Sequence, residues 1–418
     1  MTSPTRARID AVIHEIDRRL AAVLGEILHH PAVQQLESLW RGLHRLVTHT
    51  RPHENIRIDL LCVAKQTLSD DFLRADELAH SGLNHIVYTR AYASHGGQPY
   101  GLLCATFDFG PDPDDLAILR NCAAVASLAH APFVADAAPA LLGLRSLAEI
   151  PRLRDLAAAQ DGPRFAAWQT FRGEPDARHV TLCLPRFLLR APYDPDTDTT
   201  QPLHFRELID RREHLLWGHA SLLVAMRAAE AFAEQRWCLG LVGTRSGPAL
   251  LRLTHPVPTS ATLEVALAPR SERALAEVGL LALTLDRASG RAIVREAPTL
   301  QRSSTRDDLG TQLPYVLLVG RLAHYLQRVQ REHVGQWDDR NTLQRELDLW
   351  LRQYVADMDD PPPEVRARKP LRRASIALAP VDGHPGWHRC HLRVVPHLTH
   401  LGRPLTLELI GRLDLGPR

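Results

Sequence analysis

The residues best suited to metal chemistry lie near the C-terminus. The chain has 22 histidines, and the densest group contains His388, Cys390, His391, His397 and His400. On a strand, His388 and Cys390 would share one face, and imidazole and thiolate are ligands that zinc prefers. The run contains no acidic residue and the chain has no HExxH motif, so we expect no metal site. A metalloenzyme with a histidine site stays as an alternative.

Other segments that resemble catalytic motifs have simpler explanations. No lysine follows a glycine, so the GxxxxGK[ST] phosphate loop is absent. Ser246 stands one position too late for the GxSxG motif of a nucleophile elbow. Asp112, Asp114 and Asp115 precede an apolar helical run, where acidic side chains stabilise a helix N-terminus. We therefore predict no catalytic residue, no cofactor and no enzymatic activity.

Composition narrows the class of protein further. The chain has 50 Lys and Arg residues against 48 Asp and Glu, so it offers no general attraction to nucleic acid or anionic lipid. The six cysteines are scattered, and most lie in apolar runs, as buried thiols do in a reducing compartment. No window reaches the roughly 20 apolar residues of a membrane span, and no signal peptide is evident. We expect a cytoplasmic protein that binds neither nucleic acid nor membrane.

Hydropathy patterns predict alternating helices and strands. Residues 9–28 form an amphipathic pattern, and Pro31 can open a second helix. In this second helix Leu36, Trp40 and Val47 share a stripe, which we expect to pack into a core. Further strands are predicted at 56–64, 100–109, 179–184, 237–242, 262–268, 280–285 and 292–296, and further helices at 67–79, 112–130 and 213–236.

The alternation favours an α/β (mixed α+β) fold with two packed units. The 418 residues exceed the roughly 250–300 that one core usually holds. We divide the chain into a helical pair at 1–50, a large α/β core at 51–300 and a smaller helix-plus-sheet unit at 301–418. In that last unit, helices are predicted at 305–334 and 340–358, and strands at 374–380, 388–395 and 405–413.

Several unusual segments occur in a fixed order along the chain. They include HP…LESLWRGLHRLV at 30–47, AHAPF at 129–133, LPRFLLRAPY at 184–193 and RLAHY at 321–325. Together they resemble the large subunit of the type VI secretion contractile sheath, the TssC/VipB family. The residues of these and the related segments that we expect to matter are Glu37, Trp40, Arg41, Gly42, His130, Pro132, Phe133, Pro185, Arg186, Trp217, Trp237, His324, Tyr325, Pro370 and His397.

The resemblance implies a structural role. A sheath large subunit pairs with a small subunit (TssB/VipA-like) and with copies of itself around a tube of Hcp rings, and contraction drives effector injection. A non-sheath adaptor or baseplate-associated paralogue of the same machine is the alternative. Two departures stand out. The family's N-terminal extension, which the unfoldase ClpV engages, is missing before the first helix, so ClpV is not expected as a partner. His219 replaces the Asn of the family's LWGNA segment.

The C-terminal strand is a candidate for links between subunits. Leu405, Leu407 and Leu409 alternate along it, and a terminal strand can complete a neighbour's sheet through backbone hydrogen bonds. An ordinary edge strand of its own domain explains the pattern equally well.

Overall fold

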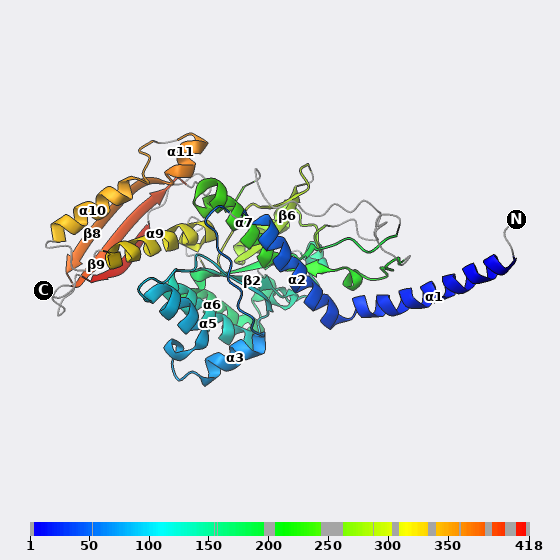
Figure 1. The fold of residues 1–418 in the computed structure, drawn as a ribbon. Coiled ribbons are helices and arrows are strands. Elements are labelled where there is room, and N and C mark those ends of the chain that lie inside the picture. The colour runs from blue at the N-terminus through cyan, green and yellow to red at the C-terminus, as the bar shows by residue number, and fades with distance from the viewer. Residues whose placement is uncertain are drawn as a thin grey trace.

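The computed structural model describes a mixed α/β fold, which confirms the predicted class. Helix α1 extends from one side of the body, and the C-terminal sheet with its helices lies on the other (Figure 1). No helix in the described part of the chain has the length and apolar character needed to cross a bilayer. The described residues are 4–51, 53–153, 155–156, 158–195, 205–243, 262–286, 288–302, 309–332, 340–358, 361–380, 387–397 and 407–414.

A five-stranded sheet forms the centre of the body, in the order β1-β2-β3-β6-β7. Neighbouring strands among the first four pair in parallel, and β7 is antiparallel to β6. Every residue of β2 and β3 is buried, as expected for central strands covered on both faces. The strands are β1 (Leu103–Phe109), β2 (Phe133–Ala137), β3 (Val180–Leu184), β6 (Leu280–Asp286) and β7 (Arg291–Val294).

Helices cover both faces of this sheet. Helix α5 (Pro113–Ala129) packs its apolar residues with Phe133 and Ala135 in one cluster. Helix α7 (Ala220–Gln235) packs with Val134 in another. Because side chains alternate along a strand, the two helices lie on opposite faces of β2.

The C-terminal part forms its own cluster around an antiparallel sheet ordered β10-β9-β8. Leucines of α9 (Leu313–Glu332) and α10 (Arg340–Arg352) pack against β8 and β9 in this cluster. Trp237 also joins it, although it precedes residue 300. The division at 1–50, 51–300 and 301–418 stays a prediction. The strands are β8 (Leu371–Pro380), β9 (Trp387–Pro396) and β10 (Leu407–Asp414).

Several predicted elements are wrong. Residues 56–64 form no strand, and Ile58, Leu60 and Leu61 are exposed. Cys62, expected to be buried, is exposed with them. Apolar alternation predicts a strand only where a neighbouring strand and a core are available. Residues 262–268 contribute a single bridge, from Leu263 to Phe187.

The region around α7 also differs from the prediction. The predicted helix 213–236 begins only at Ala220, because a 3₁₀ turn and a short strand precede it. The predicted strand 237–242 is a 3₁₀ helix instead, η9 (Cys238–Leu241). The π-helix η2 (His85–Ala93) and helices α6 (Ala166–Gly173) and α8 (Pro269–Glu277) were not predicted.

The remaining elements are shorter connections or the N-terminal pair. Their bounds are α1 (Pro4–Leu28), α2 (Pro31–His49), α3 (Lys65–Arg74), η1 (Leu78–His80), α4 (Gly82–Asn84), η3 (Pro139–Leu142), η4 (Leu147–Arg152), η5 (Ala158–Gln160), η6 (Pro163–Phe165), η7 (Pro175–His179), β4 (Phe187–Leu188), η8 (Arg212–His214), β5 (Trp217–Gly218), η10 (Leu309–Thr311) and α11 (Pro363–Arg368).

Candidate functional site

Helix α2 docks on the body through a face of small residues. Pro31 begins it, and the His30 side chain accepts a hydrogen bond from the backbone of Ala32 at 3.3 Å. Ser38 and Gly42 are spaced by four and lie inward. The Ser38 hydroxyl donates to the Trp217 carbonyl at 2.7 Å. A Cβ on Gly42 would lie 2.6 Å from a Leu222 methyl, so Gly42 lets α2 approach α7 closely.

The predicted core stripe of α2 faces outward. Trp40 is 60% exposed, and Leu36 and Val47 are exposed with it. The expectation that Trp40 packs in the core is therefore wrong. Both faces of α2 carry apolar or small residues, and the close fit of Gly42 against Leu222 places the smaller face inside.

The motif residue Glu37 belongs to a buried ionic network that joins α2 to the loop after β4. Arg190 donates to Glu37 at 2.8 Å and to Glu207 at 2.6 Å. The side chains of Arg190 and Glu207 are only 10% and 1% exposed. Burial alone would raise the pKa of Glu37, but the hydrogen bond and charge of Arg190, then those of Arg41, lower it. In this network the charged groups bind one another, and these contacts replace the hydration that burial removes.

Arg41 and His29 extend this network toward the surface. Arg41 donates to Glu37 at 2.6 Å and to the Tyr193 hydroxyl at 3.0 Å. The His29 Nε2 atom lies 3.3 Å from Glu207, and its ring stacks on His214 with centroids 4.0 Å apart. Burial and the neighbouring charge of His214 lower the pKa of His29.

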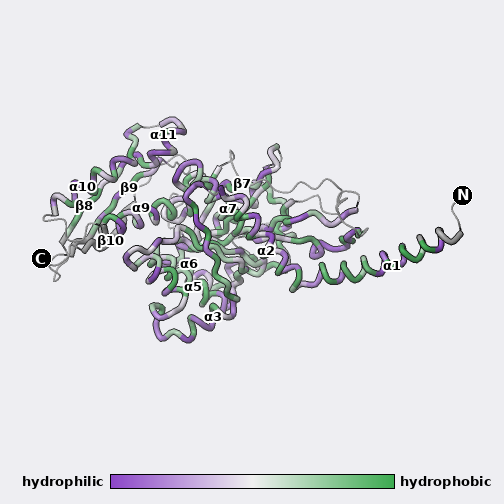
Figure 2. The backbone as a smooth tube through the Cα atoms, viewed as in Figure 1, coloured by the Kyte–Doolittle hydropathy of each residue, from purple (hydrophilic) through white to green (hydrophobic). Residues whose placement is uncertain are grey.

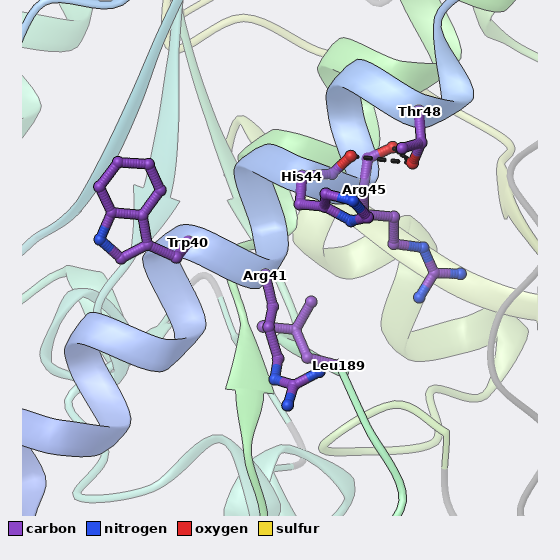
Figure 3. Close-up of a pocket in the computed structure, with 6 residues that line it drawn as sticks. All are labelled: Trp40, Arg41, His44, Arg45, Thr48 and Leu189. Atoms are coloured by element: carbon purple, nitrogen blue, oxygen red, sulfur yellow. Dashed lines mark hydrogen bonds between the residues drawn. The ribbon is translucent and has the colours of Figure 1, made fainter.

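A basic pocket opens on the outer face of α2. Its cavity volume is about 540 Å³. Figure 3 shows Trp40 projecting from one side of the helix and Arg45 from the other, with Arg41 and Leu189 close to each other below it. The pocket is lined by Trp40, Arg41, His44, Arg45, Thr48 and Leu189.

The other motif histidines stabilise joints of the fold. His130 ends α5 in a left-handed conformation, with φ of 51°. The His324 Nε2 atom of α9 lies 2.8 Å from the Ala129 carbonyl. Burial lowers the pKa of His130, and it lowers that of His324 to about 4. These neutral histidines therefore tie α9 to the end of α5. The Pro132 carbonyl next to them accepts from the backbone of Leu103 at 2.8 Å.

An aromatic cluster holds the C-terminal part against η9. The guanidinium of Arg321 lies 5.2 Å from the Trp237 ring centroid, and it donates to the Tyr325 hydroxyl at 2.6 Å. Trp237 and Tyr354 meet edge to face, with centroids 5.3 Å apart. Tyr325 packs in the same manner on Trp350. The motif residues Trp237 and Tyr325 thus belong to one packing site.

Polar residues gather where the parallel strands of the central sheet end. Arg186, which follows the cis peptide bond at Pro185, pairs with Glu264 through bonds of 2.9 and 2.7 Å. Nearby, His219 Nδ1 lies 2.7 Å from Asp136. Burial alone would lower the pKa of His219, but the hydrogen bond and charge of Asp136 raise it.

Asp136 links the end of β2 to the start of α7. Its second carboxylate oxygen accepts from the Ser221 backbone at 2.7 Å, which satisfies a donor of the first helical turn. Asp108, Asp136 and His219 have potential metal-ligand atoms within 4.8 Å of one another. Because Asp136 already bonds His219 and Ser221, helix capping accounts for its position.

The C-terminal histidines form no such group among the described residues. The His397 ring lies 3.0 Å from the Ala356 carbonyl, and its backbone donates to Pro370 at 2.9 Å. Cys390 is buried in the C-terminal cluster, and burial raises its pKa to about 12. His397 and Cys390 therefore have structural roles in the C-terminal part. His400 and Leu405 lie outside the described residues.

The structure thus distributes the motif residues over several joints. Glu37, Arg41, Gly42 and Trp217 meet at α2, and Phe133 packs edge to face on Phe109 in the core. Leu407 and Leu409 lie on β10, opposite Val394 and Leu392 of the same chain.

Sequence reasoning missed Glu207 and the partner of His219, and it gave Tyr193 no role of its own. Arg190 was visible inside the LPRFLLRAPY segment, where an arginine that follows two leucines was a signal for a buried ion pair. Nothing in the sequence placed Glu207 beside it, because 17 positions separate the two residues and the partner is set by the loop's path.

Two family models match nearly the whole chain. Residues 10–301 match the EvpB/VC_A0108 tail sheath N-terminal domain, and residues 302–413 match the EvpB/VC_A0108 tail sheath gpW/gp25-like domain. The chain is 30% identical over 426 residues to the type VI secretion system sheath protein TssC1 of Pseudomonas aeruginosa. That match covers 97% of this chain and 86% of the relative.

Solved structures give more distant matches. The sheath tail protein of Desulfitobacterium hafniense aligns with a TM-score of 0.36 at 10% identity, covering 74% of this chain and 56% of that one. A chain of the anti-feeding prophage baseplate aligns with a TM-score of 0.40 at 12% identity, covering 88% of this chain and 81% of that one.

Proposed function

Since this chain belongs to the EvpB/VC_A0108 (VipB) tail sheath family, we propose that it is a structural subunit of a type VI secretion sheath and has no enzymatic role. The family match extends over residues 10–413, and the relative in Pseudomonas aeruginosa is named a sheath protein. The observation that carries the proposal is the exposed apolar face of α1, because an assembly subunit needs such a surface.

Helix α1 is a long element whose apolar stripe is exposed in the described part of the chain. It has 25 residues, which corresponds to about 37 Å at 1.5 Å per residue. Green and purple segments alternate along it in Figure 2, as in an amphipathic helix. The apolar residues are all about half exposed: Ile9, Val12, Ile13, Ile16, Leu20, Val23 and Ile27.

This apolar face is the surface that we assign to the small sheath subunit. Leu36, near the start of α2, is exposed as well at 57%. Burial of apolar surface stabilises a complex by about 25 cal/mol per Å². Because the stripe spans most of α1, a partner that covers it gains binding free energy along most of the helix. A chain kept alone in water would expose it, which favours constant association with a partner.

Co-expression with the small sheath subunit of the same cluster tests the proposal. Parent chains should form tubules in negative-stain electron microscopy. Ile16→Asp with Val23→Asp should abolish them, because two carboxylates enter the apolar face. Both positions are exposed, so the free energy of unfolding should change by no more than about 0.5 kcal/mol per site. Ala22→Asp adds the same charge to the polar side of α1 and serves as the matched control.

Two outcomes would contradict the proposal. Tubules at parental yield from the double variant would remove α1 from the interface. A parent chain that binds the small subunit in a discrete complex, without ever forming tubules, would favour an adaptor of the same machine.

We also propose that copies of the chain link through the terminal strand. Among the described residues, strand β10 lies at one edge of its sheet and pairs with β9 alone, so its outer edge can accept a neighbour's strand. In the same assay, a chain that lacks residues 404–418 should fold but give no tubules. Tubules at normal yield would end this idea.

The last parts of the proposal concern the tube and its cargo. We propose that the sheath surrounds Hcp rings and that its contraction drives effector injection. Family membership alone supports these parts. Co-purification of Hcp with tubules from cells that express all three proteins is the measurement, and tubules that consistently exclude Hcp would refute them.

A further inference from the structure

The basic pocket on α2 is preorganised. Arg41 is held by Glu37 at 2.6 Å and by the Tyr193 hydroxyl at 3.0 Å, so its guanidinium is already fixed in place. Arg45 lies with its guanidinium 5.4 Å from the centroid of the Phe187 ring. Leu189 is buried and supplies an apolar wall. A ligand therefore loses little binding energy to the ordering of the pocket.

The charge of the pocket defines the chemistry of its ligand. No carboxylate is among the six lining residues, and three of them, Arg41, His44 and Arg45, carry basic side chains. Burial lowers the pKa of Arg45, which reflects the cost of desolvating its charge, and an incoming carboxylate offsets that cost. Trp40 and Leu189 add an apolar component. An apolar side chain with acidic neighbours fits these features.

The chain itself presents such a group at the end of α3. Leu73 is 78% exposed, the highest value among the large apolar residues of the described part of the chain. Asp70 stands one helical turn before it, and Asp76 and Glu77 follow it and are exposed. Within the described residues none of these three acids takes part in a salt bridge. We name Asp70, Leu73, Asp76 and Glu77 the acidic knob.

The knob and the pocket of one chain belong to different parts of the body. Helix α2 packs on α7 and β5, whereas α3 packs on α5 and α4. In Figure 1, α3 lies at the lower end of the body, below α5 and α6. A contact between unlike surfaces of identical chains is head-to-tail and generates rings or helical filaments. This is the symmetry that a tubular sheath requires.

We propose that the acidic knob of one copy docks in the α2 pocket of the next copy. The contact rests on the proposed function only in assuming that copies of the chain meet in an assembly. Leu73 occupies the space beside Trp40 and Leu189, and the carboxylates of Asp76 and Glu77 meet the basic side chains of the pocket. The contact is separate from the apolar face of α1, which is assigned to the small subunit.

Reciprocal charge reversal tests the contact without touching the arginines of the buried network. His44→Glu with Thr48→Glu places two carboxylates at exposed positions of the pocket. Asp76→Lys with Glu77→Lys reverses the knob. Each pair alone should weaken self-association by at least about tenfold, because like charges then oppose each other. The two pairs combined should restore it to within about threefold of the parent.

Sedimentation of the purified chain and tubule yield with the small subunit are the two measurements. Gln35→Glu adds a carboxylate to α2 outside the pocket and should leave both unchanged. A combined variant that associates no better than either pair would overturn the contact, as would single pairs that behave like the parent. Pocket variants that lose the small subunit but keep self-association would assign the pocket to that subunit and refute the copy-to-copy contact.

Failure of this inference differs from failure of the proposed function. If parent chains form tubules and all charge variants do so at parental yield, the sheath role stands and the knob contact is wrong. If parent chains form neither self-associated species nor tubules with the small subunit, both are wrong.

Discussion

Replacement of Arg190 by methionine should undock α2 from the body. Arg190 bridges Glu37 at 2.8 Å and Glu207 at 2.6 Å, and its loss leaves the nearly inaccessible Glu207 carboxylate without its main counter-charge. Removal of one partner from a buried ion pair typically costs about 3–5 kcal/mol. Methionine retains much of the side-chain volume, so the effect should arise from charge and not from a cavity.

The matched control is Arg41→Met in the same network. The Arg41 side chain is 45% exposed and Glu37 keeps Arg190, so this change should cost about 0–1 kcal/mol. The contrast between the two arginines isolates burial as the cause. A third variant, Arg190→Met with Glu37→Gln and Glu207→Gln, removes the stranded charges and should recover more than half of the lost free energy.

Hydrogen exchange measured by mass spectrometry over residues 31–49 reports the local opening of α2. A loss of about 3–5 kcal/mol should accelerate exchange there by roughly two to three and a half orders of magnitude, since about 1.4 kcal/mol corresponds to tenfold. The central strands should be unaffected. An Arg190→Met chain that exchanges no faster than Arg41→Met over this segment would refute the reasoning.

Two further substitutions test joints of the fold. Gly42→Ala should cost about 1–3 kcal/mol, because the new Cβ meets Leu222 in a packed interface; Gly25→Ala, with open space around it, should not destabilise the chain. His219→Asn should change the pH dependence. Because Asp136 raises the folded pKa of His219, this pair stabilises the fold below pH 6.5, the usual value, and the gain is lost as pH rises through the folded pKa. Urea unfolding of parent and variant at pH 6 and pH 8 should show a parent advantage that is larger at pH 6, and parallel curves would contradict the pairing.

Much of the core could be predicted from the sequence. The elements predicted at 112–130, 179–184 and 280–285 correspond to α5, β3 and β6. Continuous apolar runs and helix-start residues are signals that depend only on nearby residues, so the sequence is enough to find them. The two N-terminal helices were predicted for the same reason. The strands predicted at 56–64 and 237–242 were wrong, because the apolar composition of these segments suits a strand only when a partner strand is present.

The candidate site was likewise predictable only in part. The segments around Glu37, Arg186 and His324 were identified from sequence, but their roles were not. Glu37 and His324 have partners far away in sequence, Arg190 and Ala129, and separations of this size carry no local periodic signal. The histidine group at 388–400 looked suggestive only because its members are close in sequence.

Helix α2 shows what each level determined. The sequence by itself determined that a helix opening at Pro31 carries an apolar stripe as far as Val47, since spacing of three and four residues sets which side chains share a face. Only the tertiary structure decided that Trp40 faces outward and Gly42 inward. The physical reason is that packing depends on the surface opposite, and Leu222 accepts a glycine where it would exclude a larger residue.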